Sequence, residues 1–386
     1  MQRYAQFRAG VNDAQIPADG EQALKQIAQG LSDNLSTLEG QTTRRKDEHI
    51  AIVGQRDVAF RHTTTLLEGV QFIHESLPDL DLDEIDTSVD LMGKHLRVPL
   101  VIAGMTGGSE QGREINRKLA EEAESFGCAM GVGSQRAMLE QPRLRCTYEV
   151  RDIAPSILLF GNIGVVCARD CASSTLLEMA NQVGVDALCV HMNPSQELVQ
   201  PEGDRCFRGG LETMSRLARE LPIPVVAKET GCGISYQTAQ RLRDAGVRHV
   251  DVSGAGGTSW VAVEMERTRQ ANQVDSLGAM LREWGIPTAS SVVFSRRAGL
   301  DTVIATGGIR TGLDVAKAIA LGASVCGMAW PVLDALSRDG SQGVRRFLER
   351  VERELRTIML LIGAAKLSDL GRVPKLLSPE LKRWLD

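Results

Sequence analysis

Four polar side chains lie within seven residues of one another, directly after an apolar run of the chain. The segment DALCVHMNPSQE begins like a buried strand and then presents His191, Asn193, Gln196 and Glu197. An imidazole, two amides and a carboxylate at this spacing can hydrogen-bond a polar ligand. The alternative is a loop whose polar groups satisfy one another. The choice depends on which other side chains the fold brings to the same place.

Other side chains that can bind anions or heterocycles also follow apolar runs. Arg136, in the motif GSQR, carries a planar guanidinium that binds anions bidentately. Asn162 offers an amide to the edge of a heterocycle. Lys228 places an ammonium at the end of an apolar run, where it is costly unless it has a function.

Glycine-rich turns follow further apolar runs and favour phosphate binding. GMTGG (104–108), GAGGT (254–258) and GGIRTG (307–312) let the backbone approach a ligand closely and offer N–H groups to phosphate. We expect the last turn to open a helix whose N-terminal dipole adds to the attraction. A phosphate cradle near a lysine and an asparagine suggests flavin mononucleotide (FMN), and a phosphorylated-sugar or nucleotide substrate is the alternative.

The spacing of these segments predicts the fold. From Val98 onward, eight apolar runs alternate with helix-like segments: VPLVIAG, CAMGVG, SILLFGN, DALCVHM, PVVAKE, VDVSG, TVIATGG and SVCGMA. Continuous apolar strands separated by helices are typical of a parallel sheet covered on its outside. Eight such units over about 230 residues fit an α/β fold, the (β/α)8 TIM barrel. The alternative, a doubly wound sheet, usually carries GxGxxG after its first strand, which GMTGG does not match.

The barrel would bring the candidate residues together. In this fold the C-terminal strand ends and the loops beyond them converge on one mouth, where the active site lies. We therefore expect the polar residues after DALCV to meet Arg136, Asn162, Lys228 and the glycine turns there. The segments 110–127 and 312–323 have the apolar spacing of the helices that the barrel requires.

Composition excludes several classes of protein. The 386 residues are 43% hydrophobic, and a formal net charge of −5 without a basic stripe argues against nucleic-acid binding. The N-terminus has no apolar signal-peptide core, and no segment reaches the roughly 20 apolar residues of a membrane span. The eight cysteines include no CxxC pair, so we expect reduced thiols and a cytoplasmic location.

Two segments precede the barrel. Residues 1–41 form an extension whose leucines and isoleucine share one helical stripe, and the sequence leaves its role open. Residues 42–97 form a lead-in that begins TTRRKDEHI. This basic run is either a solvated helix start or a cap over a site for a doubly charged anion. The barrel and its C-terminal helices occupy residues 98–386.

The chain resembles type 2 isopentenyl-diphosphate isomerase, the flavin-dependent family of isoprenoid synthesis. The similarity runs from residue 42 to the end and is carried by RRKDEH, AGMTGG, MGVGSQR, GNIG, HMNPSQE, VVAKETGCGIS, DVSGAGGTSW and TGGIRTGLDVAKAIALGA. The resemblance implies interconversion of isopentenyl and dimethylallyl diphosphate, a 1,3-allylic double-bond shift in which reduced FMN is the acid and base. It also implies NADPH as reductant and a homotetramer or larger oligomer.

The resemblance implies which residues hold FMN. Lys228 would stabilise the anionic reduced flavin. Where many relatives have arginine this chain has Trp330, which leaves a backbone contact to the phosphate in place of a side-chain ion pair. The implied positions are Gly104, Met105, Thr106, Ser134, Asn162, Lys228, Ser253, Thr258, Gly307, Gly308, Ile309, Arg310, Ala329 and Trp330.

The resemblance also implies how the substrate binds. Glu197 would ligate Mg²⁺, a hard cation that accepts one carboxylate together with phosphate oxygens. Gln196 would orient the reacting carbon or relay a proton there, and Lys228 and His191 complete the implied catalytic set. The implied substrate-binding positions are Arg45, Lys46, His49, Ser134, Gln135, Arg136, Asn193 and Gln196.

Three other classes are alternatives. FMN-dependent 2-hydroxy-acid oxidases share the barrel and cofactor but use a histidine in a Ser-Asn-His-Gly-Gly turn after strand six, where this chain has SGAGG. An IMP-dehydrogenase-like enzyme needs a nucleophilic cysteine after strand six, whereas Cys232 follows strand five. A scaffold or flavin-storage protein would leave Arg136, His191 and Glu197 without a role.

Overall fold

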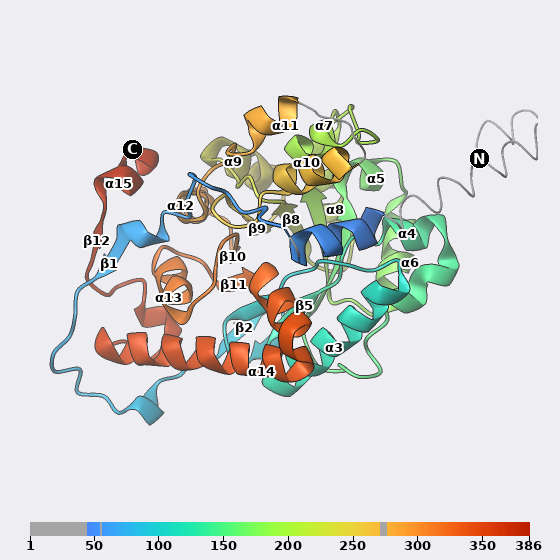
Figure 1. The fold of residues 1–386 in the computed structure, drawn as a ribbon. Helices are drawn as coiled ribbons and strands as arrows, with labels where there is room; N and C mark the ends of the chain where they lie inside the picture. Colours follow the sequence, from blue (N-terminus) through green and yellow to red (C-terminus); the bar gives the residue numbers. More distant parts are fainter. Residues whose placement is uncertain (1–44, 55, 271–275) are drawn as a thin grey trace, which may run out of the picture. The chain divides into compact units, whose positions relative to one another are not determined.

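The computed structural model of the protein describes residues 45–54, 56–270 and 276–386, so the expected extension over 1–41 lies outside it. Its centre is a closed barrel of parallel strands in the order β10-β11-β4-β5-β6-β7-β8-β9 (Figure 1). These strands are β4 (Leu100–Ile102), β5 (Ala129–Gly131), β6 (Leu159–Gly164), β7 (Ala187–Met192), β8 (Val225–Glu229), β9 (His249–Asp251), β10 (Thr302–Thr306) and β11 (Val325–Met328). Each predicted apolar run forms one strand, which confirms the (β/α)8 barrel.

The register of the barrel places polar residues side by side. His191 on β7 lies opposite Lys228 on β8, and Lys228 lies opposite Asp251 on β9. Because all the strands are parallel, these residues lie together at the C-terminal edge, which is the ligand-binding edge of such barrels.

Helices alternate with the strands, and α3 (Glu110–Phe126) shows how the local sequence begins and ends such a helix. Ser109 caps its first turn by accepting from the amide of Gly112, and Gly127 ends it with a left-handed φ of 76°. The other helices are α4 (Arg136–Glu140), α5 (Val165–Arg169), α6 (Ser173–Val183), α7 (Pro194–Val199), α8 (Gly210–Glu220), α9 (Tyr236–Asp244), α10 (Trp260–Gln270), α11 (Ser276–Leu281), α12 (Thr288–Arg297), α13 (Gly312–Ala320), α14 (Trp330–Leu361) and α15 (Pro379–Leu385). Short 3₁₀ helices are η1 (Leu67–Gly69), η2 (Leu82–Glu84), η3 (Pro142–Thr147) and η4 (Leu367–Asp369).

A hairpin closes the N-terminal end of the barrel. β2 (Val89–Leu91) pairs antiparallel with β3 (Lys94–Leu96). Leu91 and Leu96 pack among the side chains that fill the barrel interior, including Phe160. Apolar burial therefore seals this end.

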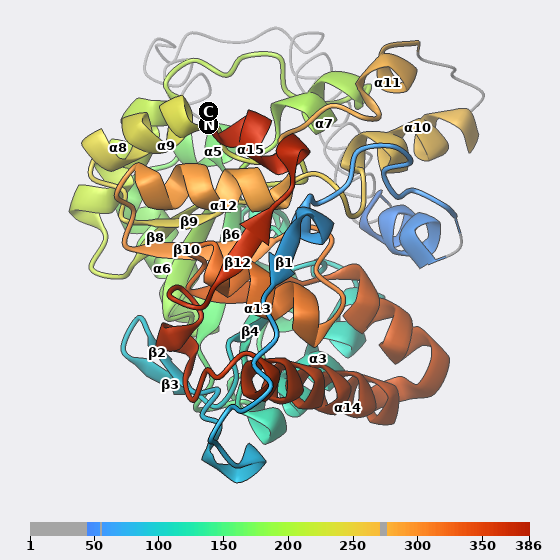
Figure 2. The same ribbon diagram turned by 90° about the vertical axis from the view of Figure 1, so that its left-hand side faces the viewer.

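The lead-in reaches the opposite, C-terminal edge. Residues 45–54 are helical, and Lys46 on this helix donates to the carbonyl of Ser134 beyond β5 (2.9 Å). Farther along, β1 (Val70–Phe72) pairs antiparallel with β12 (Lys375–Leu377), and the two strands lie side by side in Figure 2. The lead-in is thus attached both to the mouth and to the C-terminal segment.

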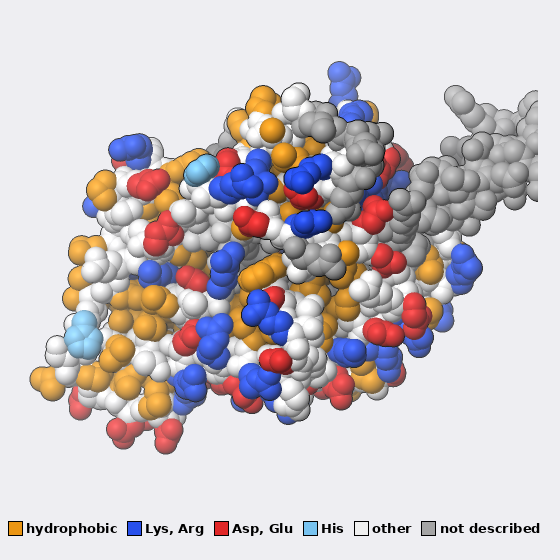
Figure 3. Space-filling model, viewed as in Figure 1, with side chains coloured by type: hydrophobic (Ala, Val, Ile, Leu, Met, Phe, Trp, Pro, Cys, Tyr) orange, Lys and Arg blue, Asp and Glu red, His pale blue; other side chains and the backbone are white. Residues whose placement is uncertain are grey.

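The molecular surface carries both signs of charge. Figure 3 shows basic and acidic side chains intermixed on the face that carries α13 and α14. On α14, Arg338 pairs with Asp334 (3.0 Å) and Arg350 with Glu354 (2.6 Å). Exposed pairs of this kind contribute at most about 1 kcal/mol each. Among the described helices, none has both the length and the apolar character needed to cross a bilayer.

Candidate active site

A cavity of about 200 Å³ lies at the mouth, between helix 45–54 and the strand ends. It brings together most of the residues that the sequence singled out. Those that line it are Arg45, Lys46, His49, Gly104, Met105, Ser134, Arg136, Asn162, His191, Asn193, Gln196, Glu197, Lys228, Ser253 and Ala329.

A second cavity, of about 70 Å³, adjoins the first and shares Ser253, Trp260, Thr306 and Ala329 with it. The other predicted residues that line it are Thr258, Gly307, Gly308, Ile309, Arg310 and Trp330. Thr106 and Gln135 line neither cavity. Gln135 is fully buried, and its Oε1 accepts from the backbone amide of Asn162 (3.0 Å), so its side chain supports a cavity residue from behind.

Lys228 lines the large cavity and forms a buried ion pair beneath it. Lys228 Nζ is 2.6 Å from Asp251 Oδ2, and both side chains are almost fully buried. Desolvating two charges costs several kcal/mol per ion before their mutual attraction is counted. The sequence indicated the lysine but not its acidic partner.

His191 is held as a neutral imidazole beside this pair. Its Nδ1 lies 2.7 Å from Asn162 Oδ1, an acceptor, so Nδ1 carries the proton. Burial lowers the pKa of His191 to about 4, and the charges of Lys228 and Arg45 act in the same direction. At neutral pH the ring is therefore uncharged.

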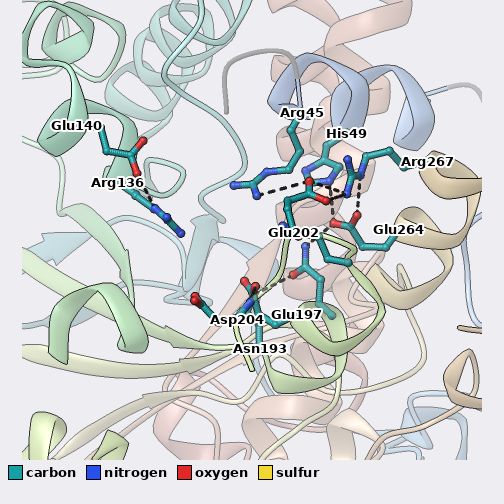
Figure 4. A network of polar contacts seen from close by, with 12 residues as sticks. Arg45, His49, Arg136, Glu140, Asn193, Glu197, Glu202, Asp204, Glu264 and Arg267 are labelled. Carbon is teal, nitrogen blue, oxygen red and sulfur yellow. Dashed lines mark hydrogen bonds and ion pairs between the residues drawn. The ribbon is translucent and has the colours of Figure 1, made fainter. Parts of the chain in front are cut away.

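Glu264 on α10 contacts side chains of helix 45–54 and of α7 as well as one on its own helix (Figure 4). It is fully buried and lies 2.9 Å from His49 Nε2 of helix 45–54 and 2.8 Å from Arg267 Nε. Gln196 Nε2 of α7 donates to the same carboxylate (3.1 Å). Burial would raise the pKa of Glu264, but the contacts with His49 and Arg267 outweigh it and lower the pKa to about 2. Glu264 thus fixes the orientation of Gln196 and His49.

Glu197 presents a carboxylate whose position is fixed. Its Oε1 accepts from Asn193 Nδ2 (2.9 Å) and its Oε2 from the amide of Asp204 (2.8 Å). Figure 4 shows the Asp204 carboxylate close to that of Glu197. In the part of the chain that the structure describes, no three His, Cys, Asp or Glu side chains form a metal-binding group. A cation at Glu197 would therefore need oxygens from a ligand, as Mg²⁺ commonly has.

Three cations surround the space in front of Glu197. Arg45 and Arg136 point toward that space from opposite sides in Figure 4. Arg136 forms an ion pair with Glu140 (2.8 Å), and Lys46 donates a hydrogen bond to the carbonyl of Ser134. Burial, followed by the charge of Arg45, lowers the pKa of Lys46 to about 7. This arrangement can bind a multiply charged anion.

The second cavity is built from backbone. A β-carbon on Gly257 would lie 2.5 Å from the amide nitrogen of Gly308, which itself has a left-handed φ of 72°. Only glycine allows these two turns to meet. Thr306 Oγ1 and Thr106 Oγ1 are buried and, among the described residues, have no hydrogen-bond partner. Of the two residues, Thr306 lines both cavities, so its hydroxyl is free to bind a polar ligand.

The expected contribution of the α13 dipole is wrong in its detail. α13 does follow the glycine turn, but its first amides are already satisfied: Asp314 Oδ2 accepts from Arg310 and Thr311, and Glu354 Oε2 accepts from Gly312. These carboxylates offset the positive end of the helix. Beside the second cavity, α14 begins after Ala329 without a side-chain cap.

Trp330, the first residue of α14, lies beside the second cavity. Its Nε1 donates to the carbonyl of Val53 (3.3 Å), which attaches helix 45–54 to the start of α14. The guanidinium of Arg310 lies 5.5 Å from the centre of the indole. A cation therefore lies at this corner, in a cation–π contact with the indole.

Comparison with known proteins identifies the family. Isopentenyl-diphosphate delta-isomerase of Pyrococcus abyssi (strain GE5 / Orsay) is 40% identical over 356 residues, which cover 90% of this chain and 96% of that protein. The enzyme of the same name from Nostoc sp. (strain PCC 7120 / SAG 25.82 / UTEX 2576) is 44% identical, with 86% and 94% covered. A family model described as FMN-dependent dehydrogenase matches residues 193–374.

Solved structures share the fold at lower identity. Mandelate oxidase with (S)-2-phenylpropionate gives a TM-score of 0.59 at 21% identity and covers 89% of this chain and 98% of its own. A mandelate oxidase variant with a monooxide FMN adduct gives 0.58 at 23%, with 82% and 90% covered. At this identity the likeness concerns the barrel alone. The near full-length matches above show more: the chain belongs to the isopentenyl-diphosphate delta-isomerase family.

Proposed function

We propose that the chain interconverts isopentenyl and dimethylallyl diphosphate, using reduced FMN and Mg²⁺. The observation that carries this proposal is that side chains suited to a flavin and side chains suited to a diphosphate line one cavity. Lys228 and Asn162 belong to the first group, and Arg136 and Glu197 to the second. The family relationship supports the same substrate pair.

The residues at the mouth fit FMN. The unpartnered hydroxyl of Thr306 and the close-packed glycine turns suit a ligand with a polar ring and a phosphate. The residues that would hold it are Gly104, Met105, Thr106, Ser134, Asn162, Lys228, Ser253, Thr258, Gly307, Gly308, Ile309, Arg310, Ala329 and Trp330. Since Asp314 occupies the Arg310 amide, we assign the phosphate to the preceding turn and to the uncapped start of α14.

Bound reduced FMN would supply the proton donor and acceptor for the allylic shift. The chain's own residues would orient the bound ligands and exclude water from the cavity. Lys228 places a preorganised positive charge at the floor of the cavity. His191 is neutral, so it adds a hydrogen-bonding group there without a second charge.

The diphosphate would bind at the charged side of the cavity. Arg45, Lys46 and Arg136 would contact its oxygens, with His49, Ser134, Gln135 and Asn193 as the supporting residues. Glu197 would ligate Mg²⁺ that bridges to the diphosphate. Binding energy gained here, away from the double bond, holds the five-carbon tail in place for reaction.

Gln196 would act at the reacting tail. It is buried, neutral and fixed by its donation to Glu264, so it can orient a proton without placing a charge in an apolar part of the site. Together with Lys228 and His191 it forms the proposed catalytic set.

Several further features belong to the same proposal. NADPH would keep the flavin reduced, the enzyme would work in the cytoplasm, and it would form a homotetramer or larger assembly. The chain would comprise an extension (1–41), a lead-in (42–97) and the catalytic barrel (98–386).

The test is direct. Purified protein with reduced FMN, Mg²⁺ and isopentenyl diphosphate is expected to yield the allylic isomer, and the protein with oxidised FMN is not. A 2-hydroxy-acid oxidase would instead turn over a hydroxy acid with oxygen and leave isopentenyl diphosphate unchanged.

Glu197→Gln tests the metal assignment. The variant should need a higher Mg²⁺ concentration and bind the diphosphate more weakly, because the amide loses the charge that Mg²⁺ requires. Glu212→Gln on the exposed face of α8 is the matched control and should behave like the wild type. An unchanged Mg²⁺ dependence of Glu197→Gln would remove Glu197 from the site.

A further inference from the structure

We infer that Asp251 is a positioning residue and counter-charge for Lys228, and that it lowers the redox potential of the bound FMN. The inference rests on the proposed function for its cofactor. Asp251 is the last residue of β9 and lies opposite Lys228 in the parallel ladder. Their side chains are 7% and 10% exposed, and Asp251 Oδ2 is 2.6 Å from Lys228 Nζ.

The carboxylate lies on the far side of the lysine from the ligand cavity. A small cavity of about 20 Å³ inside the barrel is lined by both Lys228 and Asp251. Lys228 also lines the large cavity, whereas Asp251 is absent from its lining. The ammonium therefore lies between the carboxylate and any ligand at the mouth.

Asp251 is fixed through both of its oxygens. Oδ2 accepts from Lys228, and Oδ1 accepts from the amide of Ser253 (3.2 Å). Ser253 has a left-handed φ of 36°, a conformation that persists only where neighbours hold it. These two contacts hold the carboxylate beside the lysine.

The net charge around Lys228 depends on the ionisable groups that lie beside it. His191, opposite Lys228, is neutral, and burial raises the pKa of the Cys189 thiol to about 12, so it is uncharged. Glu229, the last residue of β8, is also mostly uncharged at neutral pH, because burial raises its pKa to about 8. On the ends of β7, β8 and β9 this leaves the lysine and the aspartate as the main charges, and they nearly cancel. In a buried site this cancellation matters, because charges there are weakly screened. Asp251 therefore weakens the attraction of Lys228 for the anionic reduced flavin.

The measurement is the midpoint potential of FMN bound to the full-length enzyme at pH 7. Asp251→Asn is expected to bind reduced FMN at least tenfold more tightly relative to oxidised FMN, a positive shift of about 30 mV for a two-electron couple. Lys228→Met should shift the potential in the opposite direction. Asp251→Ser, a smaller neutral replacement, should shift it upward and serves if the asparagine variant does not fold.

The control is a matched pair at the other end of the same strands. Asp301, just before β10, pairs with Arg248, just before β9 (2.8 Å), and Asp301→Asn should leave the potential unchanged. An unchanged or lower potential in both Asp251 variants would overturn the inference, because Asp251 would then only hold the lysine in place. Wild-type protein that fails to bind FMN would instead refute the proposed cofactor, so the two failures are distinguishable.

Discussion

The two ends of the barrel are formed by the same strands but differ in how deeply their charged side chains are buried. At the N-terminal end the interior is sealed by Leu91 and Leu96, and the ion pairs formed there by Asp186 and Asp301 keep partial contact with solvent. Arg248 and Asp301, for example, are about half exposed (53% and 52%). At the C-terminal end the charges of Lys228 and Glu264 are buried.

This difference indicates which end is functional. Burying a charge is expensive even when it is paired, and an apolar replacement is often no less stable. An end built only for stability can instead keep its charges in contact with solvent, as Arg248 and Asp301 do. Substitutions at the mouth should chiefly reduce activity, and substitutions at the opposite end should affect stability by small amounts.

The largest effect is expected for Lys228→Met. Removing one preorganised electrostatic group from an active site costs about 10²–10³-fold in rate. Lys94→Met is the control, since Lys94 pairs with Asp186 at the sealed end (3.5 Å) and should keep activity within about twofold. The measurement is isomer formation with reduced FMN. Equal activities in the two variants would contradict the difference between the ends.

Glu264→Gln should show that one mouth residue also stabilises the fold. Because its pKa falls to about 2 from an ordinary value near 4.3, the charged form contributes roughly 3 kcal/mol above pH 4. That contribution is lost as the pH falls through 4 toward 2. Urea unfolding at pH 7 and at low pH should show the gap between wild type and variant closing.

A matched buried carboxylate separates fold from function in that experiment. Glu122 on α3 is buried and pairs with Arg345 (3.0 Å), and neither residue lines the cavity. Glu122→Gln should also lose stability but keep its activity, whereas Glu264→Gln should lose both, because Gln196 and His49 are released. If both variants keep full activity, Glu264 has no positioning role.

Most of the fold was predictable because its signal is local in the chain. Strands buried on both faces read as apolar runs, and their parallel order sends every C-terminal end to one mouth. Asn162, His191 and Lys228 could be assigned to that mouth from position alone. The expectation did not require knowledge of any side-chain contact.

The partners of these residues were not predictable for a physical reason. Glu264 is 68 residues beyond Gln196 on a polar helix, and Asp251 is one acid at the end of an apolar run; neither carries a periodic signal. The same holds for Glu354, which reaches from α14 to the amide of Gly312. Such contacts arise from packing between elements, which single-chain patterns do not encode.

A smaller effect concerns Lys46 and pH. Its pKa of about 7 means that the free enzyme presents an increasingly neutral amine above pH 7, whereas a diphosphate binds the charged form. The KM for isopentenyl diphosphate should therefore rise above pH 7 by up to about tenfold per pH unit. Lys46→Arg, which stays charged, should give a flat profile over the same range. A wild-type KM that is constant from pH 7 to pH 9 would exclude Lys46 from diphosphate binding.

The smallest effect is expected for Asp301→Asn at the sealed end. Asp301 accepts two hydrogen bonds from Arg248, from Nε at 2.8 Å and from Nη2 at 2.9 Å, so the geometry of the pair is as favourable as a surface pair allows. Even so, both side chains face water, which solvates the charges in the folded and unfolded chain alike. The loss in unfolding free energy should therefore stay below about 1 kcal/mol, measured by urea denaturation. If this loss in unfolding free energy matched the loss in Glu264→Gln, the solvent exposure of the charged side chains would not explain why the two ends differ. The mouth could then no longer be recognised by its buried charges.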